Sequence, residues 1–579
     1  MQRWRLLILG LILVFGGAWL AHRIETSGGV TLSEVRYPGR SGETLAGLLY
    51  VPASASRAHP APAVLVSHGY INTREMQSPF AIELARRGFV VLAIDMAGHG
   101  FSGGSLNTDD GGGAEGLAFL RALPFVDPNE IGLEGHSMGG VPLNAAARAW
   151  PDGYRAMVLE GSTTPEPGQV GAGSATFPRN LEVVFGRYDE FAPLMWRTAE
   201  GRLVGASPKL EALFGVRGPV DPDRTYGDIA AGTGRRLVIP PVTHPMEHFS
   251  KAGVGAAIAW LQMTLHGEAH PLPPSDQIWP WKEVGTAISL IGFGVLVLGA
   301  FDLLQPRIAA PAAPFRPIGW GWVAGFILAA AIPALTYMPL MNLGFAFFPS
   351  RLFPQWVTNQ VAVWALGSAL AGLLAGLVLR RPGSPWRLAG AGAAVGALIV
   401  GYLALAAVDG AFKTDFRLWV VGLKPLETAA HARDFVAYLG LFLAAFLLIA
   451  RGLAGGVVAP LRGAGAQYLA GVLAAAGGFA VLLAIQYGAL LTTGRLPDPK
   501  EALNAIIAIQ FLPILAFVGV VVVFTWRRTG SHVAGGLLCA GIITWYIVAG
   551  TATHWRPGWS VPKMDGLFPD RPAASAPKA

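Results

Sequence analysis

Polar and apolar residues are distributed unevenly along this chain, and the pattern separates it into parts. Residues 6–21 form one apolar run, residues 24–270 mix charges and prolines with short apolar runs, and beyond them long apolar segments alternate with short polar loops. About 20 apolar residues are enough for a helix to cross the hydrocarbon core of a bilayer. We therefore predict four regions: a membrane helix in residues 1–23, a soluble domain at 24–270, a membrane domain at 271–555 and a Pro-rich tail at 556–579.

The membrane domain contains eight further apolar segments that are long enough to span a bilayer. We place them at residues 284–304, 318–341, 357–379, 388–408, 435–450, 467–491, 503–525 and 533–553. Together with the first run they predict an all-α bundle of nine transmembrane helices.

Charges in the loops predict how these helices are oriented. The charged residues of alternate loops are all basic: Arg307 and Arg316, then Arg380, Arg381 and Arg387, then Arg451 and Arg462, then Arg527 and Arg528. The intervening loops contain both signs of charge. Because Lys and Arg accumulate on the cytoplasmic side, we expect a cytoplasmic N-terminus. The soluble domain and the C-terminus then lie outside the cell membrane.

The first apolar run has features of two kinds of targeting segment. It follows Arg3 and Arg5, as both signal anchors and cleaved signal peptides do. A cleaved signal peptide has a shorter apolar core and ends at a small-x-small site, which the stretch from Ala18 to Ala21 fits poorly. We expect a retained signal anchor, with cleavage as the open alternative.

Within residues 24–270, short runs rich in Val, Leu and Ile alternate with helical patterns. The strand-like runs are TLAGLLYVP, APAVLVSHGY, GFVVLAIDMAGHG, IGLEGHS, RAMVLEGS, LEVVFGRYDE and RRLVIPPVTH. Helix-like pieces such as PFAIELARRG and GGAEGLAFLRAL lie between several of them. This alternation predicts a mostly parallel sheet with helices on both faces.

One strand is followed by a motif with chemical meaning. Gly135-His136-Ser137-Met138-Gly139 matches the G-x-S-x-G elbow, in which glycines permit a tight strand-to-helix turn that exposes the serine. His68-Gly69-Tyr70 and the stretch from Asp95 to Ser102 end two earlier strands. In order and spacing these motifs resemble the α/β-hydrolase superfamily from about residue 30 to 268, most closely its dienelactone-hydrolase-like and lysophospholipase-like esterases.

The resemblance implies a Ser-acid-His triad in that chain order. It makes Ser137 the nucleophile and places the acid at Asp189, with the adjacent Glu190 as the alternative. His244, shortly after the last strand, is the expected base, and His248 is its alternative. The family also implies an oxyanion hole formed by the backbone N–H groups of Tyr70 and Met138.

Composition excludes several other classes of site. The single cysteine, Cys539, permits no intrachain disulfide and no cysteine metal cluster. The net charge of +7 comes from residues at the ends of apolar segments and forms no basic patch for nucleic acid. His68, His99 and His136 belong to turn motifs, and no metal or phosphate motif occurs. We predict no cofactor and no metal.

The combined reading is a membrane-anchored serine hydrolase that cleaves carboxylic esters at the outer face of the membrane. Its position favours an ester or lipid-like small-molecule substrate, with membrane lipids as neighbours. The alternatives are a peptidase or acyltransferase that uses the same triad, and a non-catalytic sensing or transport-associated protein. For the helical bundle we favour anchoring over transport, because few ionisable residues lie inside its spans. The oligomeric state is not predicted.

Overall fold

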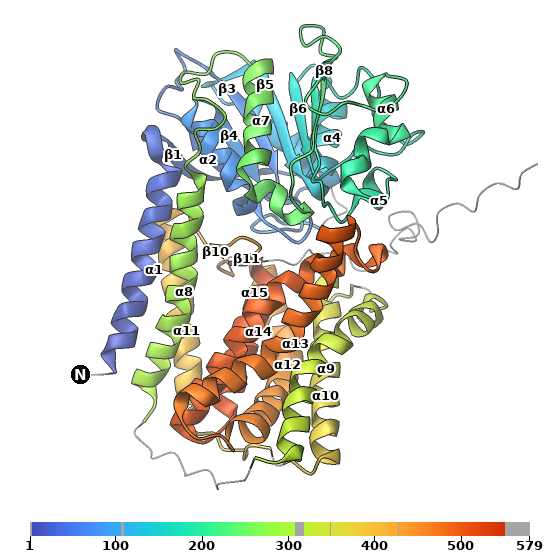
Figure 1. The fold of residues 1–579 in the computed structure, drawn as a ribbon. Coiled ribbons are helices and arrows are strands. Elements are labelled where there is room, and N and C mark those ends of the chain that lie inside the picture. The colour runs from blue at the N-terminus through green and yellow to red at the C-terminus, as the bar shows by residue number, and fades with distance from the viewer. Residues whose placement is uncertain are drawn as a thin grey trace, which may run out of the picture.

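A computed structural model describes residues 3–105, 109–306, 318–347, 349–381, 383–426 and 428–550. A sheet domain lies at one end of a bundle of long helices (Figure 1). The predicted tail at 556–579 and the end of the last predicted span lie outside the described residues.

The sheet has nine strands in the order β1-β2-β4-β3-β5-β6-β7-β9-β8. Their bounds are β1 Thr31–Pro38, β2 Thr44–Val51, β3 Ala61–Ser67, β4 Val90–Ile94, β5 Val126–His136, β6 Ala156–Glu160, β7 Leu181–Val184, β8 Thr225–Tyr226 and β9 Arg235–Val238. From β4 to β9 neighbouring strands are parallel, whereas β1, β2 and β8 pair antiparallel. The predicted mostly parallel sheet is confirmed, although the sequence pattern missed β1 and β8.

Helices cover both faces of this sheet. The helices of this domain are α2 Ser78–Arg86, α3 Gly113–Arg121, α4 Gly140–Ala149, α5 Ala192–Met195, α6 Pro208–Phe214 and α7 Lys251–Thr264. One apolar core lies between the sheet and α3, α4 and α6, and a second lies between the sheet and α2 and α7. The central strands are apolar on both sides for this reason.

Nine helices of the described residues are long and apolar enough to cross a membrane. They are α1 Trp4–Glu25, α8 Trp279–Leu304, α9 Trp320–Phe345, α10 Trp356–Val378, α11 Ala391–Phe412, α12 Ala429–Gly452, α13 Ala464–Thr493, α14 Ala502–Thr529 and α15 Val533–Gly550. Each overlaps one predicted span. The helix α8 begins earlier than the apolar run of residues 284–304, and its first turns contain the charged Lys282 and Glu283, which are buried and pair at 3.1 Å.

Short helical turns connect these elements. The 3-10 turns are η1 Ser27–Gly29, η2 Arg74–Gln77, η3 Asp109–Gly112, η4 Ser137–Gly139, η5 Gly201–Ala206, η6 His244–Phe249 and η8 Pro499–Glu501, and η7 Leu453–Val458 is π-helical. Two of them, η4 and η6, carry predicted site residues.

The first helix, α1, packs along α8 on one side of the bundle (Figure 1). A side chain at Gly10 would collide with the backbone of Leu296, and one at Gly17 would collide with the backbone of α8 at Gly285. Small residues let membrane helices approach closely in this way. The Ser289 hydroxyl also donates to the carbonyl of Val14 at 2.8 Å.

A β-hairpin between α11 and α12 connects the bundle to the sheet domain. Its strands are β10 Phe416–Leu418 and β11 Val421–Leu423, and neither was predicted. Just beyond it, Lys424 Nζ donates to both carboxylate oxygens of Glu75 at 2.7 Å, with both side chains buried. The Trp419 indole donates to the carbonyl of Pro245 at 2.5 Å. We call this segment, residues 416–424, the docking hairpin.

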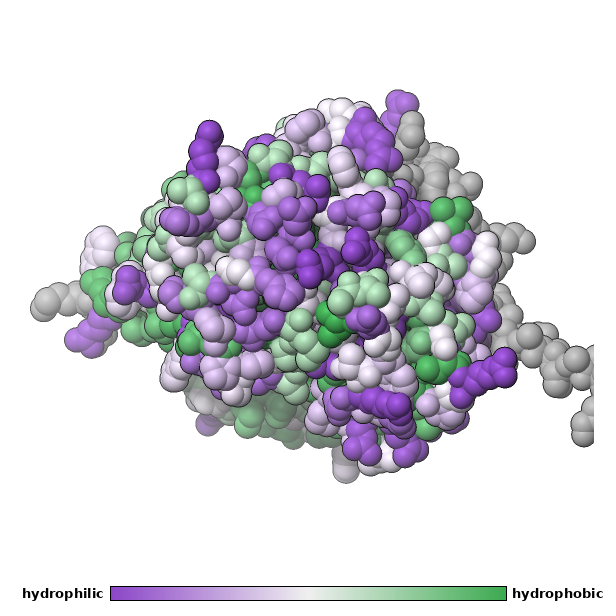
Figure 2. Space-filling view, turned by 90° about the horizontal axis from the view of Figure 1, so that it is seen from above, coloured by the Kyte–Doolittle hydropathy of each residue, from purple (hydrophilic) through white to green (hydrophobic). Residues whose placement is uncertain are grey.

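The sheet domain also has a surface on the side away from the helical bundle. Figure 2 looks onto it and shows hydrophilic residues over much of the surface, with scattered apolar ones between them. Such a surface is typical of a face in contact with water.

Candidate active site

Ser137 lies at the sharp turn between β5 and α4. Its backbone φ is 55°, in the left-handed region that residues other than glycine seldom adopt. A side chain at Gly139 would collide with the carbonyl oxygen of Ser67, so the turn needs glycine at that position. The Ser162 hydroxyl donates to the Ser137 carbonyl at 2.6 Å and helps to hold this strained turn.

Two side chains from other strand ends meet Ser137. His244, the first residue of η6, has Nε2 at 2.9 Å from the Ser137 hydroxyl. Its Nδ1 lies 2.8 Å from a carboxylate oxygen of Asp189, which follows β7. With Asp189 ionised, Nδ1–H donates to the carboxylate, and Nε2 is left to accept the serine proton. The three predicted residues thus form one hydrogen-bonded chain.

The two alternative residues lie close by but have different contacts. His248 is buried, and neither of its ring nitrogens has a hydrogen-bond partner among the described residues. Its ring contacts the edge of His136, with centroids 4.3 Å apart. Glu190 accepts a hydrogen bond from the backbone N–H of His244 at 2.8 Å, so it holds the histidine's loop and does not contact its ring.

The two predicted oxyanion groups belong to adjacent turns. Met138 follows Ser137 in η4, and Tyr70 lies on the loop after β3. A side chain at Gly69 would lie 3.1 Å from the Ser137 Cβ, so glycine lets this loop approach the serine. Ile71, with φ at 55°, strains the same loop. Ser137 and Ile71 thus lie on two neighbouring turns, and both have a strained backbone conformation. Strained residues of this kind cluster at functional sites.

Burial and neighbouring charge set the proton affinities at this site. Burial lowers the pKa of His244, but the charge and hydrogen bond of Asp189 outweigh it, so this pKa lies above its usual 6.5. Burial, helped by the Asp189 charge, raises the pKa of Glu190 to about 7. Burial lowers the pKa of His248 to about 3, with the neighbouring His244 adding to the effect.

A buried layer behind the triad was not predicted from the sequence. Burial and the charge of Asp189 raise the pKa of Glu247 well above its usual value, and one of its oxygens accepts the N–H of Gly186. Ligand atoms of His136, His244 and Glu247 lie within 4.8 Å of one another, a spacing that a metal ion can bridge. However, His136 Nε2 lies 3.1 Å from the His244 carbonyl, a contact that a donating N–H satisfies.

The histidines of the other turn motifs also have hydrogen-bond partners. His68 Nε2 accepts the backbone N–H of Met96 at 3.0 Å, and its Nδ1 lies 2.7 Å from the Gly69 carbonyl. His99 Nδ1 lies 3.2 Å from the Ala97 carbonyl. These contacts agree with a role in the turns.

Apolar residues of the helical bundle pack close to the triad. The Phe191 ring packs against His244, with centroids 4.7 Å apart. Phe191 also belongs to an apolar cluster with Leu490 at the end of α13 and Ile506 in α14. On the other side, Ile71 is buried in the core cluster of the bundle. The carboxyl edge of the sheet, where Ser137, Asp189 and His244 lie, therefore faces the helical bundle.

Several known proteins resemble a part of this chain. A family model described as serine aminopeptidase, S33, matches residues 58–193. An uncharacterised protein of Pseudomonas aeruginosa is 35% identical over 124 residues, which are 20% of this chain and 33% of that protein. The monoacylglycerol lipase of Mycolicibacterium smegmatis is 26% identical over 252 residues, 42% of this chain and 81% of the lipase.

Among solved structures, an esterase of Pyrococcus furiosus is 15% identical with a TM-score of 0.30, covering 41% of this chain and 92% of the esterase. The matched part of this chain thus spans about a third of the length of the Pseudomonas aeruginosa protein and most of the length of the lipase. The matched segment of the family model includes β3, the Ser137 turn and Asp189.

Proposed function

The chain contains a domain of the α/β-hydrolase superfamily, and on this basis we propose that it is a membrane-anchored serine hydrolase acting on lipid-derived carboxylic esters. The observation that carries the proposal is the hydrogen-bonded chain from Ser137 through His244 to Asp189, which begins at a strained turn and faces the membrane helices. The match to a lipase is consistent with an ester substrate.

In this proposal Ser137 Oγ attacks the carbonyl carbon of the ester while His244 Nε2 takes the hydroxyl proton. The N–H groups of Tyr70 and Met138 bind the developing oxyanion. His244 then gives the proton to the departing alcohol. Water attacks the acyl-serine with His244 again as the base, and the carboxylic acid leaves. Asp189 stays ionised and keeps Nδ1 protonated.

The surroundings of the triad support a substrate that arrives from lipid. Phe191, Leu490 and Ile506 form an apolar wall beside His244, and two of these residues belong to membrane helices. These three side chains are buried, so they hold the site against the ends of two long apolar helices, where we expect an amphiphile from the outer leaflet to arrive. The docking hairpin also holds the proposed site against the helices. The indole of Trp419 donates to the carbonyl of Pro245, the residue after the proposed base.

Covalent labelling tests the proposal directly. Full-length protein in nanodiscs should react with a fluorophosphonate probe, and mass spectrometry should find the adduct on Ser137. The same protein should hydrolyse a monoacylglycerol faster than an aminoacyl p-nitroanilide. The reverse preference would favour a peptidase, as in the serine aminopeptidase family whose model matches residues 58–193. Absence of any adduct on folded protein would contradict a serine hydrolase.

The pH dependence of turnover is a second prediction. His244 must be neutral to accept the serine proton, and its pKa lies above 6.5. The acid limb of a plot of kcat/KM against pH should therefore have its midpoint above 6.5, with activity falling as the pH drops through it. Replacing Asp127, a partly exposed side chain at the start of β5, by asparagine should leave this midpoint unchanged. A midpoint clearly below 6.5 would contradict His244 as the base.

We also propose that the hydrolase domain lies outside the cell, as the loop charges predict. Cys539 is the single cysteine and is buried, so the parent protein should give little background labelling by a thiol reagent. A membrane-impermeant maleimide should label Asp152→Cys, on the hydrolase domain, in intact spheroplasts. It should label Arg380→Cys, at the other end of the bundle, only after lysis. The opposite pattern would invert the topology.

A further inference from the structure

The membrane bundle contains a cavity of about 280 Å³ between α9, α10, α12 and α14. Its lining on α10 runs from Val361 to Leu379, about 27 Å of helix at 1.5 Å per residue. The cavity volume is close to the lower end of the range for ligand pockets. Because this small volume extends along about 27 Å of helix, the cavity is a narrow channel. Its walls are apolar for most of their extent, with residues such as Trp364, Phe446 and Phe511. The channel thus has the shape of one extended hydrocarbon chain.

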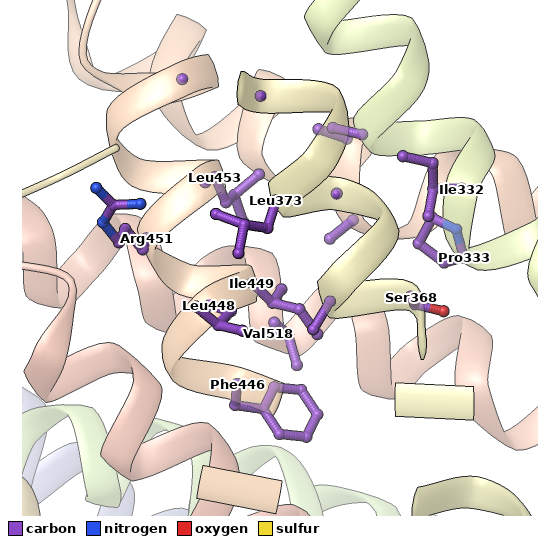
Figure 3. A pocket seen from close by; sticks show the side chains of 18 of the residues that line it. Ile332, Pro333, Ser368, Leu373, Phe446, Leu448, Ile449, Arg451, Leu453 and Val518 are labelled. Atoms are coloured by element: carbon purple, nitrogen blue, oxygen red, sulfur yellow. The ribbon is translucent and has the colours of Figure 1, made fainter. Parts of the chain in front are cut away.

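Two arginines line one end of this channel. Arg381 follows α10 and Arg451 lies in the last turn of α12, both at the end of the bundle away from the hydrolase domain (Figure 1). Figure 3 places Arg451 at one side of the cavity, with Ile332 and Pro333 on the opposite side. No acidic residue is among the described residues of the lining. The channel therefore combines an apolar length with a positively charged end.

The hydrogen bonds of these arginines leave their charge uncompensated. Arg381 donates to the backbone carbonyls of Trp322 and Gly456. The Nε of Arg451 is buried and has no hydrogen-bond partner among the described residues. A buried donor without a partner is uncommon and calls for a ligand or water to satisfy it. An anion at this end would supply both the missing acceptor and the missing charge.

The backbone beside the arginines is also unusual. The segment η7, which directly follows α12, is π-helical and contains Gly456, whose carbonyl accepts from Arg381. Single π-helical turns within helices occur frequently at functional sites. Here the turn brings a carbonyl from the end of α12 to the arginine that follows α10. It thereby links the two chain segments that carry the charges.

We propose that this channel binds a long-chain fatty acid, with the acyl chain along α10 and the carboxylate at Arg381 and Arg451. Guanidinium groups bind carboxylates through charge-assisted, often paired, hydrogen bonds. The narrow channel fits one chain, which favours a fatty acid over a two-chain phospholipid. Leu328 and Leu377 line the channel and are exposed, so its wall is open there, and the ligand is expected to enter from the surrounding lipid. The proposal does not depend on the hydrolase activity.

Photo-crosslinking tests this site in the full-length protein. A diazirine analogue of palmitate should label peptides of α10 and α12 in nanodiscs, and palmitate should compete while hexadecanol and inorganic phosphate should not. The double variant Arg381→Gln, Arg451→Gln should bind palmitate about tenfold or more weakly. Gly376→Leu should abolish labelling, because a side chain there meets no other group within 4 Å and would extend into the channel.

Matched controls separate this site from general effects on the bundle. Arg380→Gln removes an exposed charge next to Arg381 that does not line the channel, and Gly440→Leu adds a side chain at an open position outside it. Both should bind palmitate like the parent. Unchanged binding in the arginine pair and in Gly376→Leu would overturn the proposal. Preferred binding of lysophosphatidate over palmitate would overturn the choice of a carboxylate.

Discussion

Replacing Ser137 by alanine is expected to lower ester turnover by about 10⁴ to 10⁶-fold, the range typical of losing the nucleophile of a Ser-His-Asp triad. The hydroxyl lies 2.9 Å from His244 Nε2 and has no substitute in the variant. The loss should appear in kcat more than in KM, because the substitution removes the attacking group and leaves the surrounding residues unchanged. Initial rates on a monoacylglycerol, together with fluorophosphonate labelling, measure it.

A second serine provides the control for this variant. Ser250 caps α7 by accepting the N–H of Gly253 at 2.9 Å, and it has no contact with the triad. Ser250→Ala should destabilise the fold by about 1 kcal/mol, as the loss of a helix cap does, and should keep its turnover. If Ser137→Ala retained more than about a tenth of the parent rate, a different nucleophile would have to carry the reaction.

Replacing Asp189 by asparagine should reduce kcat by about 10⁴-fold near neutral pH. An asparagine can accept only weakly at His244 Nδ1 and can instead present its own N–H there, which favours the wrong tautomer of the ring. The 2.8 Å contact makes this effect direct. A steady-state rate measurement on a soluble short-chain ester avoids limits from substrate delivery.

Glu190→Gln is the matched variant for this prediction. The Glu190 side chain accepts the backbone N–H of His244, and a glutamine oxygen can do the same. We expect its kcat to fall by less than about tenfold, because the ring contact is untouched. An equal loss in Asp189→Asn and Glu190→Gln would mean that the acid had been assigned to the wrong carboxyl group.

Much of the fold follows from local sequence pattern. The parallel core strands are short, continuous apolar runs, and each membrane span is an apolar run of bilayer length, so both were predicted close to their observed positions. The antiparallel edge strand β1 is half exposed and contains Glu34 and Arg36, so it lacks that signature. The docking hairpin was not predicted because each of its strands has only three residues, which is too short for a strand pattern. In the sequence, its loop was informative only through its charges.

The candidate site was predictable only where motifs mark it. The glycines around Ser137 mark the expected nucleophile, and the superfamily resemblance places the expected base at His244, after the last strand. Nothing local marks Glu247, which acts through contacts with residues far away in the chain. The packing of Ile71 against the bundle and the pairing of Glu75 with Lys424 are likewise tertiary. The superfamily resemblance is confirmed, whereas the roles of the individual residues stay predictions.

The docking hairpin also has a consequence for biogenesis. Glu75 and Lys424 are 349 positions apart, and the N-terminal half leaves the ribosome first. Until the hairpin is synthesised, Glu75 has no lysine partner, and Ile71, next to Tyr70, lacks its apolar neighbours. Docking is therefore a late step of assembly. The sheet domain therefore reaches its final packing only after most of the nine long apolar helices that the structure describes have been synthesised.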